Sequence, residues 1–219
     1  MTRGSADWRA PVHQTALRSG LEGTRSLALC AALSVVSASP AAAGGFWKPF
    51  LAGGLSGLAI HEASHLSLDF AFDAEPRFKG VRFGPIPFFA ITHRSDVTPE
   101  REAFISGAGF FSQHVTSEII LSRRASGDAL SNFEKGALTF HVATSIAYAG
   151  AAFARHGPFE RDTRGLADAT NTDERLIGVL VLAPAAFDVW RYLRPGSRTA
   201  KWGSRIAKVG FVSLIALKR

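Results

Sequence analysis

Cysteine is almost absent from this sequence: the 219 residues include only one, Cys30. A disulfide bond within the chain is therefore excluded as a source of stability. Charged residues are also scarce, at 20%, whereas 47% of the residues are hydrophobic. An apolar fraction this high excludes an intrinsically disordered chain. A chain of this length can bury a hydrophobic core of ordinary size, so we expect one domain that folds without cross-links.

Acidic residues are missing from the last part of the chain, beyond Asp188. The basic residues of that part account for more than the whole net charge of +7. They begin beside Trp190 and Tyr192, and such a mixture of aromatic and basic residues is typical of the cytoplasmic edge of a membrane. We therefore expect membrane lipid as a partner and no nucleic acid. The pattern predicts an integral membrane protein, of the bacterial inner membrane, in which the helix that carries Asp188 ends in the cytoplasm.

The N-terminal part has the pattern of an export signal or a membrane anchor. An uncharged run, 26–47, follows four arginines, and small residues at 37–43 offer a cleavage site. We predict that residues 1–43 are a signal peptide or an uncleaved anchor. Residues 44–219 are expected to form a single membrane-embedded domain.

The rest of the sequence predicts a mainly α fold. Helices are expected over 46–72, 100–121, 136–154, 175–193 and 206–217, the last in the membrane interface. Glycines in the first of these helices suit close helix packing. Two short strands around a Pro/Gly turn are expected within 77–94, and a surface loop over 155–174. Only 26–47 and 136–154 meet the simple criterion of about 18 uncharged apolar residues for a membrane span. Since the other helices contain ionisable groups, which face the interior of a bundle in membranes, we expect a membrane-embedded helical bundle with a polar centre and a short β-hairpin.

A metal-binding motif lies in the first of these helices, where His61, Glu62 and His65 form an HExxH pattern. Residues at i and i+4 project from one face of a helix, so both imidazoles can bind one zinc ion. Glu62 lies beside the open coordination position. Its carboxylate can take a proton from a water molecule whose pKa the metal has lowered to about 7. We predict that Zn²⁺ is the cofactor and Glu62 the catalytic base.

Zinc needs a third protein ligand, and the sequence leaves several candidates open. Asp188 closes an apolar helix, while His114 and Glu118 form another i, i+4 pair. Asp69 lies one turn beyond His65 and is better suited to support a ligand than to bind the metal. His93, at the end of the predicted hairpin, is a candidate for contact with the metal or the substrate.

These motifs resemble those of the site-2 protease family of intramembrane zinc metalloproteases. The shared features follow one another along the chain: HExxH at 61–65, a hairpin with Phe and Gly at 81–88, small residues at 105–109, and Asp188 after 184–187. The resemblance implies Asp188 as the third ligand. It also implies hydrolysis of peptide bonds in or beside the membrane, in a membrane-associated protein or peptide that pairs with the hairpin.

The number of helices between the HExxH motif and Asp188 introduces an alternative to Asp188 as the ligand. Two helices lie between the HExxH helix and the one that carries Asp188, and two full crossings would put Asp188 on the opposite side of the membrane. Either the polar helix 100–121 does not cross fully, or His114 or Glu118 is the ligand. Two other functions stay open as well: a catalytically silent membrane protein with a structural or vestigial metal site, and a soluble exported zinc protease.

Overall fold

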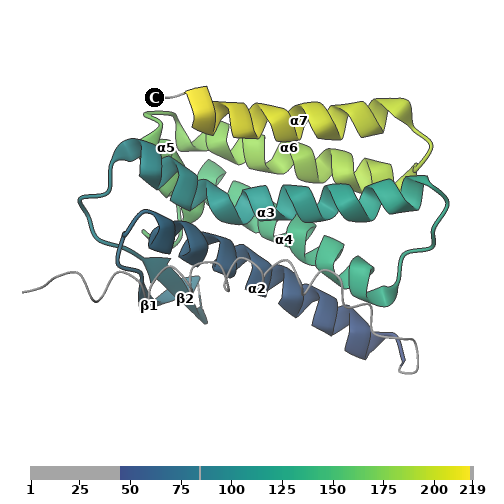
Figure 1. Ribbon diagram of the computed structural model, residues 1–219, viewed down its shortest axis with the longest axis horizontal. Coiled ribbons are helices and arrows are strands. Elements are labelled where there is room, and N and C mark those ends of the chain that lie inside the picture. The colour runs from purple at the N-terminus through teal and green to yellow at the C-terminus, as the bar shows by residue number, and fades with distance from the viewer. Residues whose placement is uncertain (1–44, 84, 218–219) are drawn as a thin grey trace, which may run out of the picture.

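The computed structural model describes residues 45–83 and 85–217. The predicted signal peptide or anchor, 1–43, lies outside these residues. The described chain contains these elements (Figure 1): α2 (Trp47–Ala71), β1 (Arg77–Phe83), β2 (Ile86–Thr92), α3 (Pro99–Ala125), α4 (Asn132–Ala154), α5 (Asp162–Ala169), α6 (Glu174–Leu193) and α7 (Arg198–Leu217). The prediction of a mainly helical fold with a short antiparallel hairpin is confirmed.

The long helices lie side by side, and the hairpin and α5 are both at one end of them (Figure 1). At this hairpin end, α2 and α4 finish while α3 and α6 begin. At the opposite end, α3 and α6 finish while α4 and α7 begin. Helix α4 packs between α2 and α6, and α7 lies against α6. Within this arrangement α4 and α6 are long and apolar enough to cross a membrane.

Glycines bring α2 and α4 into direct backbone contact, as the small residues of α2 predict. A Cβ atom on Gly53 would lie 1.9 Å from the carbonyl oxygen of Phe133, and one on Gly136 would lie 1.9 Å from that of Phe50. Real Cβ atoms do not approach backbone so closely, so neither position tolerates a side chain. This contact fixes the position of α2, which carries the HExxH motif, against the rest of the bundle.

Two expectations about the C-terminal half need correction. The segment 155–174, expected to be a surface loop, contains α5, because Thr163, Leu166, Ala167 and Thr170 are buried at helical spacing. Helix α7 begins at Arg198 rather than at 206. This helix is amphipathic, and basic residues interrupt the apolar ones in its first part. The first part therefore has no continuous apolar run from which a helix could be predicted.

Candidate metal centre

Helix α2 places His61 and His65 one turn apart, with both rings buried in the bundle. Their Nε2 atoms lie 3.2 Å from each other, so the two imidazoles point at the same spot. The i, i+4 spacing of the HExxH motif therefore has the geometry that was expected of it.

The third residue at this spot is Asp162, the first residue of α5. Its Oδ2 atom lies 3.1 Å from Nε2 of His61 and 3.3 Å from Nε2 of His65. Tetrahedral zinc with bonds of about 2.0–2.1 Å separates its ligand atoms by about 3.3 Å. Two imidazole nitrogens and one carboxylate oxygen at these distances fit a zinc ion. Among the described residues, this is the one group of His, Cys, Asp and Glu that meets the geometry of a metal site.

A buried ion pair holds Asp162 in place. The guanidinium of its neighbour Arg161 donates two hydrogen bonds of 2.6 Å to Glu174, and a third to the carbonyl of Pro158. Thr163 also donates to Glu174. Because Glu174 begins α6, these bonds tie the start of α5 to the start of α6 and so fix the carboxylate of Asp162.

The Nδ1 atoms of both histidines also have partners, which orient the rings. Nδ1 of His65 lies 2.7 Å from the carbonyl oxygen of Ile105, and Nδ1 of His61 lies 3.0 Å from Nε2 of Gln113. A carbonyl oxygen only accepts, so Nδ1 of His65 carries a proton, and Nε2 is the nitrogen that faces the position of the metal. Gly109 gives the ring of His61 its space, since a Cβ atom there would lie 2.3 Å from the imidazole.

The surroundings of Asp162 keep its carboxyl group in the ionised form. Burial raises the pKa of Asp162, but the imidazoles of His65 and His61 outweigh this effect and hold the pKa below its usual value. The carboxyl is thus ionised at neutral pH, and that is the form that binds metal ions. The side chain of Asp162 is 13% exposed, so the site is buried but reachable.

A cavity of about 470 Å³ opens beside the three ligand atoms, and Glu62 and His65 both line it. The hairpin contributes six consecutive residues, 88–93, to its wall. Since alternate side chains of a strand point to opposite faces, a consecutive run shows that the edge of β2 borders the cavity. Helices α3 and α4 supply Ile105, Thr144 and Tyr148 on other parts of the wall.

His93 is held by carboxylates beside the cavity. Its Nδ1 atom lies 3.3 Å from Oδ1 of the fully buried Asp69, and its Nε2 atom faces Glu102. These two carboxylates raise the pKa of His93 to about 10, against the effect of burial. The predicted supporting residues Asp69 and His93 are thus brought together, and they connect the end of the hairpin to α2 and α3. His93 also lines the cavity, where a substrate can reach it.

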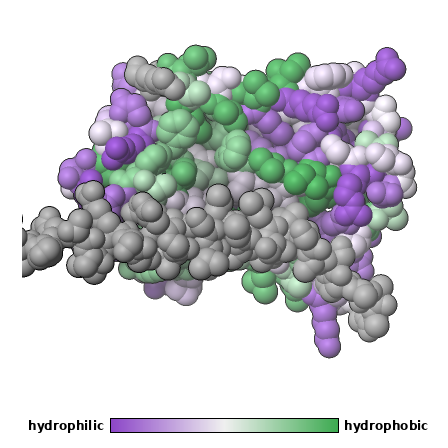
Figure 2. Space-filling model, viewed as in Figure 1, coloured by the Kyte–Doolittle hydropathy of each residue, from purple (hydrophilic) through white to green (hydrophobic). Residues whose placement is uncertain are grey.

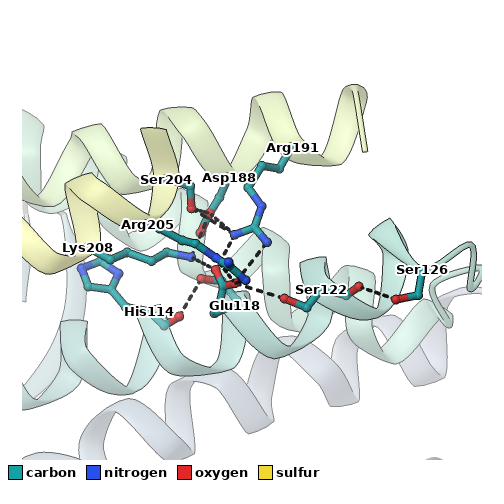
Figure 3. A network of polar contacts seen from close by, with 10 residues as sticks. His114, Glu118, Ser122, Ser126, Asp188, Arg191, Ser204, Arg205 and Lys208 are labelled. Atoms are coloured by element: carbon teal, nitrogen blue, oxygen red, sulfur yellow. Dashed lines mark hydrogen bonds and ion pairs between the residues drawn. The ribbon is translucent and has the colours of Figure 1, made fainter. Parts of the chain in front are cut away.

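Asp188 is not brought to the histidine pair. It lies with Glu118 in a cluster of charged residues on α3, α6 and α7 (Figure 3). This Glu118 cluster consists of Glu118, Asp188, Arg191, Ser204, Arg205 and Lys208. Asp188 accepts a hydrogen bond of 2.6 Å from Ser204 and pairs with Lys208 at 2.9 Å. Glu118 binds the guanidinium groups of Arg191 and Arg205.

The even number of full-length helices between α2 and α6 explains why Asp188 lies far from the two histidines. Helices α3 and α4 both run the full length of the bundle, so the C-terminal ends of α2 and α6 lie at opposite ends (Figure 1). His114 is also apart from the metal group: it lines a small buried cavity with His141 and Asp188. Its side chain is 7% exposed, and its Nε2 atom has no hydrogen-bond partner among the described residues.

Sequence reasoning missed Asp162 because it lies in the segment 155–174, which has few apolar residues. The signal that was available is the spacing of Thr163, Leu166, Ala167 and Thr170, which indicates one buried helical face. That face would have predicted α5 and placed Asp162 at its first turn, where the helix dipole favours a carboxylate.

Comparison with known protein families, with curated proteins and with solved structures finds no match to this chain.

Proposed function

We propose that the protein is a membrane-embedded zinc metalloprotease that resembles site-2 proteases. One observation carries the proposal: His61, His65 and Asp162 converge at the ligand distances of zinc, and Glu62 lines the cavity beside them. A site with three protein ligands that faces a cavity is typical of catalytic zinc, whereas structural zinc is usually closed by four protein ligands.

The residues divide the chemistry of peptide hydrolysis among them. Zinc held by His61, His65 and Asp162 would polarise the scissile carbonyl and lower the pKa of water to about 7. Glu62 takes the proton from the attacking water and passes it to the nitrogen of the leaving peptide. Tyr148 stacks on His61, with ring centroids 6.2 Å apart, and closes the site on the side of α4. Each proton that Glu62 accepts is returned, so the residue is unchanged after one cycle.

The edge of β2 supports a substrate in extended form. Residues 88–92 of the strand line the cavity, and a strand edge of this kind binds a peptide as an additional strand. The apolar side chains around it, which include Val81, Phe89 and Ile91, suit a hydrophobic segment. A membrane-associated peptide, locally unwound beside the hairpin, fits these features.

The distribution of polar residues supports placement in a membrane. Large apolar side chains are exposed on several helices: Leu51, Leu55, Phe111, Val115, Ile119, Ile146, Val179, Ile206 and Val209. Polar side chains are buried between the helices: His61, Gln113, His114, Ser117, His141, Ser145, Asp188 and Lys208. Figure 2 shows hydrophobic residues across the middle of one face and hydrophilic residues mainly toward its two ends.

The two candidate membrane-spanning helices, α4 and α6, also support placement in a membrane. Only 39% of the apolar stretch of α4 and of α6 is buried within the bundle, whereas the core helix of a soluble protein is mostly buried. The lipid bilayer is the solvent that makes such exposure favourable. A soluble exported protease would instead expose these apolar faces to water, which disfavours that alternative.

The decisive experiment separates metal binding from catalysis. The full chain, purified in detergent, is tested for zinc by mass spectrometry and for cleavage of quenched fluorescent peptides with hydrophobic centres. We expect Glu62→Gln to keep its zinc and to lose at least about 100-fold in cleavage rate, because general-base catalysis contributes about that much. Glu75→Gln, an exposed control in the turn before β1, should match the wild type in both.

Two results would overturn the proposal. A wild-type protein that holds zinc but cleaves no peptide favours a structural metal site in a catalytically silent protein. Release of the protein from membranes by alkaline carbonate, without detergent, contradicts its placement in the bilayer.

A further inference from the structure

The amide of Gln113 contacts a proposed metal ligand, His61, within the buried interior of the bundle. Gln113 lies on α3 and is 1% exposed, and its Nε2 atom lies 3.0 Å from Nδ1 of His61. The Oε1 atom of the same amide is buried and has no hydrogen-bond partner among the described residues. A buried amide with one atom on a ligand histidine and the other unpaired calls for an explanation, because an unpaired buried acceptor is costly.

The orientation of this amide agrees with the proton arrangement of His61 without metal. Nε2 of His61 lies 3.1 Å from the Asp162 carboxylate, which only accepts, so the proton of His61 belongs on Nε2. Nδ1 then accepts a hydrogen bond from the amide NH₂ of Gln113. Both ring nitrogens are thereby satisfied.

Metal binding reverses these requirements. Both histidines converge through Nε2, so Nε2 of His61 must offer its lone pair and the proton must be on Nδ1. An amide NH₂ cannot accept from an Nδ1–H group, but the amide oxygen can. The partner that His61 needs is the Oε1 atom of Gln113, which now faces away.

We propose that Gln113 is a positioning residue of the metal centre, whose amide turns over on metal binding and presents Oε1 to Nδ1 of His61. This inference rests on the proposed metal site. The turned NH₂ group faces the small cavity that Gln113 shares with His141 and Asp188. Both ring nitrogens of His141 are buried without partners among the described residues, so its unprotonated nitrogen is available there as an acceptor. The two orientations of the amide thus match the two states of the site.

The test uses cobalt alone as the probe, on the full chain in detergent after its metal has been removed with a chelator. The readouts are the Co²⁺ dissociation constant, measured by competition, and the visible absorption of bound cobalt, which reports its ligand geometry. Gln113→Met keeps the length of the side chain but removes the amide oxygen. Gln113→Glu keeps an acceptor in every orientation. Thr116→Val is the matched control, since Thr116 is also buried on α3 but bonds to the carbonyl of Ser112.

We expect Gln113→Met to weaken Co²⁺ binding by about 10–100-fold and to alter the cobalt spectrum, because partners of ligand histidines commonly have effects of this size. We expect Gln113→Glu to bind about tenfold more tightly than the wild type, since a charged acceptor makes the stronger hydrogen bond. Thr116→Val should match the wild type.

The outcomes separate this inference from the function on which it rests. If the wild type and Thr116→Val bind no cobalt, the proposed metal site falls and this role of Gln113 falls with it. If both bind cobalt and Gln113→Met binds as tightly as they do, only the role of Gln113 is overturned. If Gln113→Met does not fold, Gln113→Glu decides: tighter binding supports the role, and equal or weaker binding overturns it.

Discussion

Two buried groups of ionisable side chains lie in the same helical bundle, and they differ in how their charges are balanced. In the Glu118 cluster, each carboxylate faces cations of the protein itself, as Asp188 faces Lys208 at 2.9 Å. In the metal centre, Asp162 pairs with two imidazoles, whose nitrogens converge with it on one point, and with no Lys or Arg of the described residues. An acidic residue on an apolar helix is therefore a poor guide to a metal site. What distinguishes the ligand is a carboxylate without a Lys or Arg partner, beside a cavity.

Exchanging one carboxylate for an amide in each group should produce the largest difference between them. Asp162→Asn removes a charged ligand, and we expect zinc affinity to fall by at least about 100-fold, more than the loss of a supporting residue causes. Asp188→Asn should leave zinc affinity unchanged, because Asp188 pairs with Lys208 and Ser204 instead. Zinc competition against a chelator measures both. Loss of zinc from Asp188→Asn alone would contradict the assignment of Asp162.

Removing the centre of the Glu118 cluster should act on stability and not on metal binding. Glu118→Ala leaves the guanidinium of Arg191, which is 4% exposed, with only the more distant carboxylate of Asp188, at 3.9 Å. We expect the free energy of unfolding to fall by about 3 kcal/mol, as for other broken buried ion pairs. Arg155→Ala breaks an exposed pair with Asp173 and should cost less than about 1 kcal/mol. Denaturant titration in detergent measures both, and equal losses would mean that the cluster does not hold the helices together.

The ionic group around His93 adds a pH dependence of its own, which His93→Gln separates from that of other groups. The pKa of His93 is about 10 in the folded protein, above the usual value of about 6.5. Its stabilising effect is therefore complete below about pH 6.5 and is lost as the pH rises through about 10. We expect hydrogen exchange in β2 to show weaker protection at pH 10 than at pH 6.5, beyond the intrinsic effect of pH on exchange. In His93→Gln this additional change should disappear. Its persistence would assign the pH dependence to another group.

The loss of one helix cap at the opposite end of the bundle provides a reference value for these losses of stability. Ser131 and Glu134 form a capping box at the start of α4, in which each side chain bonds to the backbone of the other. Ser131→Ala should lower the free energy of unfolding by about 1 kcal/mol. The same denaturant titration measures this loss. A loss as large as that of Glu118→Ala would show that the ionic cluster is no more important than an ordinary helix cap.

The sequence predicts the long elements well because their signals are local. The apolar run of α4 and the Pro/Gly turn between the strands fix those elements within a few residues, and HExxH spacing alone brings His61 and His65 together. The third residue of the group that could hold a metal is different, because its position depends on tertiary structure. Asp162 reaches the histidines through the packing of α5 and the Arg161–Glu174 ion pair, and neither contact leaves a pattern in a short window of sequence.

The number of full-length helices between α2 and α6 is a property of the whole chain that the sequence does predict. Two full helices between α2 and α6 place their C-terminal ends apart, and this simple count already disfavours Asp188. The count cannot find the replacement, because His114 and Glu118, the remaining candidates, lie on α3 at the depth of Asp188 and not of His65. The residue that completes the group, Asp162, lies in the polar segment 155–174, for which the sequence predicts a loop.

The distance along the chain between the two halves of the metal centre sets the order of its assembly. Synthesis proceeds from the N-terminus, so the two histidines emerge long before Asp162, which is 97 residues beyond His65. Until α5 has emerged and Arg161 has met Glu174, the nascent chain carries only two of the three residues that could hold a metal ion. The group of three is therefore incomplete during synthesis, and it is completed only when α5 packs against the finished bundle.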